Sequence, residues 1–524
     1  MSRKDVHRLI FRFSLLLLVC GIPFCRPLMS MGLLLLAVNW IAEGNFREKG
    51  KRIRRTPLLW VCLLLFAVHL AGLCYSENLG YAANDLIIKI PLFALPLIFA
   101  TTEALDQREY TALLQIYLFA VCASVCIGTL HFLRHPEITD KREIALYISY
   151  IRLGLNLSFG SFVSLHFLHA EKQGRRRKGI FLLYLTALAY LVCMMCYIGA
   201  LTALTLTGTG LLVFTVIFSL RQQNKFTRLL IPILLLAAGL IGGLRLRNDI
   251  REYTRAEPLE NADRLTALGH PYTDTLCKEY IENGTYVYSY LCEEELETAW
   301  KQRSSMGYND WTADGGHIVR YVLIRYLNSK GLRKDAEGVR ALNDADIRAI
   351  ESGKANVHYT ASGLEARYYE TLWDLSLYFR CHEMGGSVPQ RFEVWRISLM
   401  QISEHPLFGT GTGDVKDAFG QKLETEDSPA NGILVRSHNQ YLSFAIAFGW
   451  IGLAICLFSL LYPPFATRKK RNSLYLAFLL IFLLSMFTDD PLERQDGVTL
   501  FAFFNSLFLF LLPEGGKEEP HIQK

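Results

Sequence analysis

The sequence predicts an all-α polytopic membrane protein with about twelve transmembrane helices and one large, mostly helical extracytoplasmic loop. Three observations lead to this fold class. Hydrophobic residues make up 51% of the 524 residues, they form blocks too long for ordinary core helices, and basic clusters flank these blocks. A spanning helix needs about 20 apolar residues, because roughly 30 Å of hydrocarbon is crossed at about 1.5 Å per residue. Twelve such blocks lie near residues 8–24, 27–43, 57–74, 85–101, 111–132, 144–168, 179–198, 200–220, 229–244, 438–462, 473–488 and 497–513.

The topology follows from what flanks these blocks. The first block is interpreted as an uncleaved helix, because no small-residue cleavage site follows it cleanly and a second block comes at once. The net charge is +6, and basic residues cluster at 47–55, 172–178, 221–228 and 468–471. Threading twelve spans from a cytoplasmic N-terminus places all four clusters on the cytoplasmic side, as the positive-inside bias requires. Both termini are therefore expected in the cytoplasm, and nucleic-acid binding is disfavoured because each cluster adjoins a span.

This threading predicts four regions along the chain. Residues 1–244 carry helices one to nine, 245–437 form a large periplasmic loop, 438–513 carry helices ten to twelve, and 514–524 form a cytoplasmic tail. The loop is polar, with turns such as Glu282-Asn283-Gly284 and helical patterns at 293–302 and 332–350. Long insertions of this kind are usually functional.

Most of the twelve cysteines lie in or beside spans, where they act as small hydrophobic residues. Cys193 and Cys196 form a CxxC inside a hydrophobic helix that lacks His or acidic neighbours, so metal or redox use is disfavoured there. The loop contains Cys277, Cys292 and Cys381. An oxidising compartment would permit one disulfide among these three, and the pair stays open.

A histidine at the end of the loop is the first candidate for chemistry. Ser437-His438-Asn439 opens a hydrophobic helix that also contains Gly449 and Gly452, and the spacing places His438 and the glycines on one helical face. The positive end of the helix dipole disfavours imidazolium, which favours a neutral ring able to act as a general base. The alternative is an interfacial histidine that bonds only to a headgroup or to backbone.

Arg391 and Trp395 are the second candidates. They lie one turn apart on an amphipathic segment, residues 391–402, that is expected to lie along the membrane surface. A guanidinium grips phosphate with two hydrogen bonds and keeps its charge. The alternative is a surface arginine paired with lipid headgroups.

A glycine-rich stretch, Gly409 to Asp414, resembles a phosphate loop only superficially. It lacks the Lys-Ser/Thr pair and the preceding buried strand, and it lies outside the cytoplasm. We interpret it as a flexible turn that brings backbone near the site.

Arg152 and Lys89 are basic residues that fall within predicted spans well inside the chain. Arg152 is expected some eight residues from the outer end of its helix, or about 12 Å deep, where a charge must be paired. Intramembrane charges are functional candidates, although a long side chain can also reach the headgroups. Lys89 lies closer to a helix end and is expected to reach the membrane surface in this way.

The last outer loop carries Asp489, Asp490, Glu493 and Arg494. The spacing of Asp490 and Arg494 predicts an ion pair at a helix end. A metal site there lacks a His or a further acidic run beside it in the sequence. We expect a structural or substrate-orienting role.

With these residues the sequence becomes recognisable. His438-Asn439, followed by Gly449 and Gly452, resembles the signature of the O-antigen ligase family, which includes O-antigen polymerases and protein glycan ligases. The segment from Arg391 to Gly413 is similar to the stretch upstream of that signature, and 323–335 resembles the loop of Bacteroidetes members. The resemblance covers the whole topology, and its specific motifs lie within about residues 296–452.

The resemblance implies a membrane glycosyltransferase with a GT-C-like helical fold in the bacterial inner membrane, its active site facing the periplasm. Its donor would be an undecaprenyl-diphosphate-linked glycan, passed en bloc to a hydroxyl of lipid A–core, with inversion at the anomeric centre. His438 would be the catalytic residue. Substrate would be bound by Arg391, Arg152, Trp395, Asn439 and Arg325. The family needs no cofactor and no metal.

One departure concerns a second arginine. Family members often carry a diphosphate-binding arginine in a membrane helix, but the comparable stretch here, residues 197–203, has none. Arg152, Arg320 or Arg325 would have to replace it, or the donor would be held differently.

Other functions stay open at this point. A polymerase of the same superfamily would join donor repeats to one another, and a protein O-glycan ligase would use a protein acceptor. A secondary transporter needs charged residues near the membrane midplane and usually has internal repeats. The sequence has few charges at the midplane of its predicted spans and no evident repeat. A non-catalytic glycan assembly protein would tolerate the loss of His438.

Overall fold

The computed structural model describes residues 2–138, 140–173, 178–220, 224–256, 264–273, 280–361, 363–432, 436–466 and 472–512. The basic residues 175–177, Arg221 and 468–471, together with Cys277 and the predicted tail 514–524, lie outside these ranges. The chain divides into two compact units. Unit 1 comprises Met1–Thr215 and Val394–Lys524, and unit 2 comprises Val216–Glu393.

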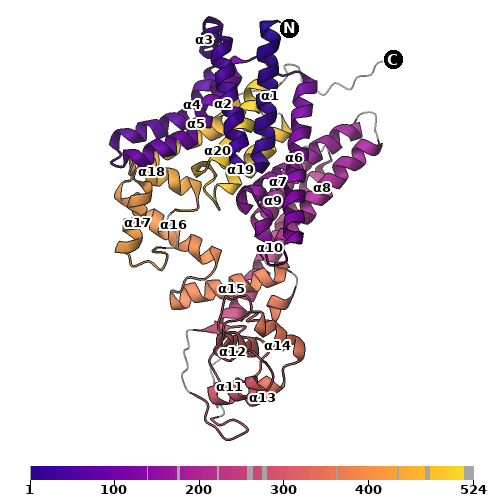
Figure 1. The fold of residues 1–524 in the computed structure, drawn as a ribbon, viewed down its shortest axis with the longest axis vertical. Helices are drawn as coiled ribbons and strands as arrows, with labels where there is room; N and C mark the ends of the chain where they lie inside the picture. The colour runs from indigo at the N-terminus through magenta and orange to yellow at the C-terminus, as the bar shows by residue number, and fades with distance from the viewer. Residues whose placement is uncertain are drawn as a thin grey trace. The chain divides into compact units, whose positions relative to one another are not determined.

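Unit 1 is a helical bundle whose helices come from both ends of the chain (Figure 1). Its N-terminal helices are α1 (Arg3–Phe24), α2 (Arg26–Glu43), α3 (Phe46–Arg55), α4 (Pro57–Ala71), α5 (Leu79–Thr101), α6 (Gln107–Arg134), α7 (Tyr150–Gln173), α8 (Lys178–Ile198) and most of α9 (Leu201–Leu220), with short 3-10 turns η1 (Gly72–Tyr75) and η2 (Lys141–Ile144). Its C-terminal elements are the end of α16 (Ser387–Glu404), α17 (Val415–Thr425), α18 (Gln440–Ala466), α19 (Ser473–Ser485), η5 (Pro491–Glu493), α20 (Gln495–Ser506) and η6 (Leu507–Leu511).

The helices confirm an all-α polytopic membrane protein. Among the described residues, eight helices are long and apolar enough to cross a membrane, or nine if α2 and α3, bent by 112°, count as one broken span. Three shorter apolar helices, Leu201–Ile217, Ser473–Ser485 and Gln495–Leu511, coincide with further predicted blocks. The count of twelve crossings and the orientation of the termini stay predictions.

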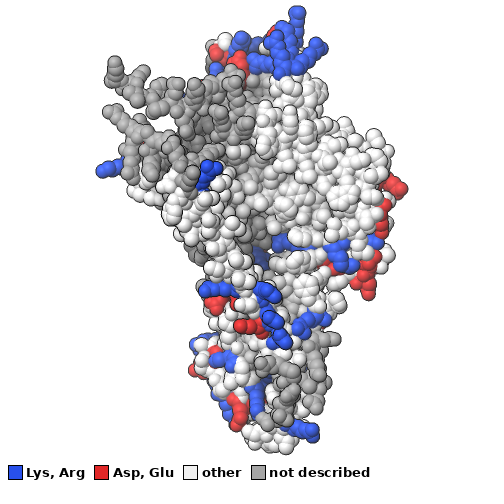
Figure 2. All heavy atoms as spheres, turned by 180° about the vertical axis from the view of Figure 1, so that it is seen from behind, with Lys and Arg blue, Asp and Glu red and all other residues white. Residues whose placement is uncertain are grey.

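The surface supports the membrane assignment. Large apolar side chains such as Leu34, Phe119 and Leu183 are between 64% and 75% exposed, which is costly in water and natural in lipid. Figure 2 shows a broad band almost without charged side chains, and Lys and Arg gather at the end where Figure 1 places the N-terminus and α3. The exposed basic residues of α3 include Arg47, Arg54 and Arg55.

Unit 2 begins with the end of α9 and α10 (Lys225–Thr254) and continues into a small folded region. A tight hairpin joins β1 (Ile281–Glu282) to β2 (Thr285–Tyr286) through Asn283 and Gly284, both at positive φ, as a type I′ turn requires. The helices that follow are α11 (Glu293–Lys301), α12 (Val319–Ser329), α13 (Ala336–Arg340), α14 (Asp344–Glu351), η3 (Val357–Thr360), α15 (Gly363–Cys381) and the start of α16.

Unit 2 has its own hydrophobic core, in which Trp300, Leu323 and Val339 are fully buried. The helical pattern predicted at 293–302 corresponds to α11, and the pattern at 332–350 divides into α13 and α14. Residues 394–437, which the threading assigned to the loop, cluster with unit 1.

Candidate active site

His438 lies two residues before α18, in a left-handed backbone conformation with φ of +48°. Non-glycine residues adopt this conformation rarely, and it is concentrated at functional sites. The expectation that His438 and Gly449 share one face of a continuous helix is wrong. His438 precedes the helix, and α18 is broken at Gly449, where φ is +62° and ψ is −168°.

Asn439 explains how the helix starts directly after His438. Its side-chain oxygen accepts hydrogen bonds from the backbone N–H groups of Tyr441 at 3.0 Å and Leu442 at 3.2 Å. These are N-cap contacts, which satisfy the unpaired donors of the first helical turn. Asn439 thereby fixes the chain next to His438.

A carboxylate faces His438. Asp489 Oδ1 lies 4.0 Å from His438 Nδ1, and Asp489 is 5% exposed. Burial alone would raise the pKa of Asp489, but the His438 side chain and the Arg152 guanidinium outweigh it and hold this pKa below its usual range. Asp489 is therefore ionised and can stabilise positive charge on the imidazole ring.

Arg152 holds Asp489 from the other side. Its guanidinium forms an ion pair with the Asp489 carboxylate, donates to the Asp490 carbonyl oxygen at 3.2 Å, and lies 3.9 Å from Asp496. Helix α7 begins at Tyr150, so Arg152 lies in its first turn and not eight residues inside it, as expected from the sequence. It is 3% exposed, and the carboxylates offset the cost of burying its charge.

Asp490 differs from its neighbour. Burial, together with the charges of Asp489 and Glu493, raises its pKa well above the usual range for a carboxyl group. Asp490 Oδ2 lies 3.9 Å from Arg436, and Arg494, its expected partner, is exposed. The predicted ion pair between Asp490 and Arg494 is thus replaced by a contact between Asp490 and Arg436.

A second buried network adjoins the first. Lys89 forms ion pairs with Asp85 and, at 3.1 Å, with Glu493, and its side chain is fully buried. The expectation that Lys89 extends to the membrane surface is wrong, because these two carboxylates pair it inside the bundle. Gln440 Nε2 donates to Glu493 at 2.7 Å, and this bond ties the network to the start of α18.

These networks surround a pocket within unit 1. Its lining includes the basic residues Lys89, Lys416 and Arg436, and acidic side chains that include Asp490. Apolar side chains, among them Phe444 and Phe448, form other parts of the wall. Ser437, the neighbour of His438, also lines it. The pocket therefore combines cationic groups with an apolar wall directly beside the histidine.

The glycine-rich segment packs on the break in α18. The glycine at position 449 allows the backbone at Leu407 to approach α18, because a Cβ at residue 449 would lie 2.2 Å from the Leu407 carbonyl carbon. Thr410 N donates to Ile446 O at 2.8 Å, and Trp450 N donates to Pro406 O at 2.8 Å. These contacts are those of an ordered loop that closes the broken helix, so the expected turn does bring backbone to α18.

The remaining candidates are distributed over both units. Trp395 is half-buried in the part of α16 that belongs to unit 1. Arg391 is half-buried in the part that belongs to unit 2. Arg325 lies on α12 of unit 2 and binds Glu282 through two nitrogens at 2.8 and 2.9 Å, with its guanidinium 3.9 Å above the Trp373 ring. Arg320, also on α12, pairs with Glu293.

Sequence reasoning selected His438 as a candidate but did not predict that Asp489, about fifty residues later in the chain, lies next to it. A signal was present: Arg152 was expected inside a span, about eight residues from its outer end, and Asp489-Asp490 directly follow the outer end of another span. A charge at that depth needs a partner of opposite sign. No histidine is next to Asp489 in the sequence, but the fold brings His438 close to Asp489 and Asp490.

Two comparisons with known proteins show what this chain is similar to. Residues 347–457 match the family model described as O-antigen ligase, and this range includes Arg391, Trp395, His438 and Gly449. An uncharacterised protein of Haemophilus influenzae is 27% identical over 161 residues, which are 29% of this chain and 40% of that protein. The chain thus spans less than half the length of this relative. Residues 347–457, which contain His438 and the break at Gly449, are therefore similar to the O-antigen ligase domain.

Proposed function

We propose that this protein is a membrane glycosyltransferase that transfers a glycan from undecaprenyl diphosphate to a hydroxyl of lipid A–core. The observation that carries the proposal is that His438 lies 4.0 Å from the ionised Asp489, near a pocket lined by basic side chains. His438 also lies within residues 347–457, the range that matches the family model. Arrangements of this kind serve the removal of a proton from a hydroxyl group.

In this reaction the acceptor oxygen attacks the anomeric carbon while the bond from that carbon to the diphosphate oxygen breaks. The hydroxyl proton passes to His438, and the electron pair of the broken bond leaves with the lipid diphosphate. Asp489 stabilises the imidazolium that forms. Direct displacement gives inversion at the anomeric centre, so a product with the donor's original configuration contradicts this mechanism.

Negative charge develops on the departing diphosphate, and fixed cations stabilise it. Within the pocket, Lys89 is already paired with two carboxylates, whereas Arg436 faces Asp490 at 3.9 Å. The raised pKa of Asp490 favours its neutral form, which leaves the charge of Arg436 to an incoming phosphate. We assign Arg436 and Lys416 to the diphosphate. For Arg391, the family resemblance alone implies the role of a loop arginine that binds diphosphate.

Arg152, Arg325 and Asn439 take other roles in this proposal. Arg152 acts through Asp489, because its guanidinium is buried among carboxylates. Arg325 stabilises unit 2 through Glu282 and Trp373. Asn439 caps α18, and Trp395 offers its half-buried ring as a wall for sugar or lipid.

The proposal is tested with surface glycolipids from cells that lack the protein and from cells that carry His438→Ala at matched membrane levels. We expect both to lose long-glycan bands and to accumulate glycan on the lipid carrier. His405→Ala is the matched control, since His405 is exposed in the same unit.

The outcomes separate the alternatives. Shortened chains on the carrier, with capping of lipid A–core intact, would identify a polymerase. Loss of glycan from a protein acceptor, with normal glycolipid, would identify a protein O-glycan ligase. Normal glycolipid in the His438→Ala strain, with a defect only in the deletion, would exclude His438 from the reaction.

A further inference from the structure

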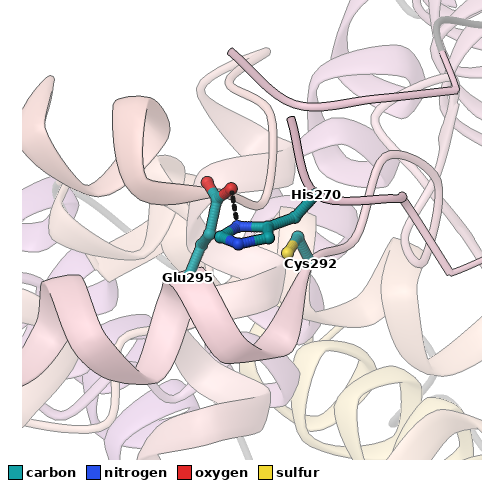
Figure 3. Close-up of side chains that lie close together, drawn as sticks. All are labelled: His270, Cys292 and Glu295. Carbon is teal, nitrogen blue, oxygen red and sulfur yellow. Dashed lines mark hydrogen bonds and ion pairs between the residues drawn. The ribbon is translucent and has the colours of Figure 1, made fainter. Parts of the chain in front are cut away.

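A cluster of three potential metal ligands lies in unit 2, among residues that the proposed transfer reaction does not use. His270, Cys292 and Glu295 each offer one donor atom, and these three atoms lie within 4.8 Å of one another. Figure 3 shows the carboxylate of Glu295 and the thiol of Cys292 next to the His270 ring. Cys292 is 5% exposed and the Glu295 side chain 4% exposed, whereas His270 is about half exposed.

The backbone holds the three donors in place before any ion binds. Cys292 directly precedes α11 and Glu295 lies in its first turn, so their spacing of three residues places both on one side of the helix start. His270 belongs to a tight loop in which Thr266 N donates to His270 O at 2.8 Å. Thr273 N donates to Leu291 O at 2.8 Å, which ties this loop to the residue before Cys292.

The Glu295 carboxylate is oriented by groups behind it. Its Oε2 accepts the Ala336 N–H at 3.1 Å, and its Oε1 accepts the Thr266 hydroxyl at 2.5 Å and His270 Nδ1 at 2.8 Å. The contacts from Ala336 and Thr266 are outer contacts of the kind typical of metal-binding carboxylates, whereas the contact from His270 joins two of the proposed ligands. They fix the direction of the lone pairs that an ion would use.

The donor set selects a class of ion. A thiolate, an imidazole nitrogen and a carboxylate suit zinc and related transition metals, and do not suit magnesium or calcium, which prefer oxygen. In tetrahedral zinc sites the donor atoms are separated by roughly 3.4–3.6 Å, given bonds of about 2.0–2.3 Å. The three donors lie within 4.8 Å of one another, so no separation exceeds these values by more than about 1.4 Å, and His270 Nδ1 and Glu295 Oε1 are closer, at 2.8 Å.

The electrostatic surroundings favour a cation. The charged groups that act most strongly on the Cys292 thiol, Glu295, Glu294 and Asp335, are all acidic. The other histidine cluster in the described residues, His438 with Asp489 and Asp490, differs in this respect. There the Arg152 guanidinium already binds Asp489 and repels a metal ion.

We propose that His270, Cys292 and Glu295 form a structural binding site for a zinc-class ion that fastens the loop at 264–273 to the start of α11. Binding releases the thiol proton of Cys292 to solvent. Water completes the coordination on the side where His270 is exposed. The site stands on its own and does not depend on the glycosyl transfer proposed above.

The test uses the full-length protein, purified in detergent. Elemental analysis is expected to find one bound zinc per chain after dialysis against zinc. Cobalt(II) substituted for zinc is expected to produce the sulfur-to-cobalt charge-transfer absorption that reports a thiolate ligand. This spectrum is recorded on the unaltered protein, so it does not depend on whether a variant folds.

Variants identify the ligands. Cys292→Ser is expected to abolish the charge-transfer band. His270→Ala and Glu295→Gln are each expected to weaken zinc binding by at least the roughly 10–100-fold that loss of an outer partner costs. Cys381→Ser and His358→Ala are the matched controls in unit 2 and are expected to keep the band.

Hydrogen exchange provides a second readout. Removal of zinc by a chelator is expected to increase exchange at 264–273 and in the first turn of α11, with α14 unchanged. Absence of bound zinc, a cobalt spectrum without the sulfur band, or a band that survives in Cys292→Ser would each overturn the proposal. So would a disulfide between Cys292 and Cys277, detected by mass spectrometry of the unreduced protein.

Discussion

Asp489→Asn tests the two charge contacts of the Asp489 side chain, with His438 and with Arg152. The substitution keeps the size of the side chain and removes its charge. It takes away the anion 4.0 Å from His438 and also the ion-pair partner of the buried Arg152. We expect loss of turnover from the first effect and loss of stability from the second.

The two effects have different magnitudes. Unit charges 4.0 Å apart interact by about 4 kcal/mol at an effective dielectric constant of about 20. Because the His438 side chain is 35% exposed, solvent reduces this to about 1–3 kcal/mol, or roughly 10–100-fold in turnover. An uncompensated buried charge at Arg152 costs about 3–5 kcal/mol of stability, at the lower end here because Asp496 is also near.

A double substitution distinguishes the roles. Thermal unfolding in detergent and transfer of a lipid-linked glycan in vitro are measured for Asp489→Asn, Arg152→Met and the two combined. Removing both charges is expected to recover most of the lost stability, since no buried charge is left unpaired. Turnover is expected to stay at the level of Asp489→Asn. If the double variant regains the wild-type rate, Asp489 serves only to neutralise Arg152, and the reasoning about His438 is refuted.

Three further predictions follow from other contacts. Gly449→Ala places a methyl group 2.2 Å from the Leu407 carbonyl carbon, at a backbone conformation that favours glycine. It should lower the free energy of unfolding by at least about 1–3 kcal/mol, measured by thermal unfolding. The control Gly420→Ala, where the added methyl group meets open space, should not lower it. Burial lowers the pKa of Lys334 to about 7, so between about pH 7 and pH 10 the unfolded chain binds a proton that the folded chain does not, and stability rises with pH over that window. Lys334→Met should therefore stabilise unit 2 most below about pH 7, by up to about 4 kcal/mol, and a gain in denaturant unfolding that grows toward high pH would contradict the assignment. Arg436→Gln should raise the KM for the lipid-linked donor by about tenfold, and an unchanged KM would remove Arg436 from the diphosphate site.

The helices were predictable because apolar blocks of spanning length have few alternatives in a bilayer. The family signature was also readable, since His438, Gly449 and the segment from Arg391 to Gly413 are close together in the sequence. Local turn chemistry was equally accessible, as the Asn283-Gly284 hairpin illustrates.

What could not be predicted depends on contacts between distant segments. Lys89 was expected at the membrane surface, but its partner Glu493 comes from the other end of the chain. The depth of Arg152 was misjudged because a helix start inside an apolar block is not marked by composition. The break in α18 was hidden for a related reason: Gly449 was interpreted as a small packing residue, and only the backbone of Leu407 shows why a glycine is needed.

The break in α18 also has a consequence for how the protein is made. At Gly449 the helix gives up backbone hydrogen bonds that a bilayer cannot replace, and Pro406, Thr410 and Gly411 supply partners for them. These three residues precede α18 in the chain, so the ribosome has already delivered them when the helix emerges. Biogenesis can thus insert α18 with its unpaired groups satisfied at once. A circular permutation that moved residues 406–413 behind α18 would reverse that order and expose the break to lipid.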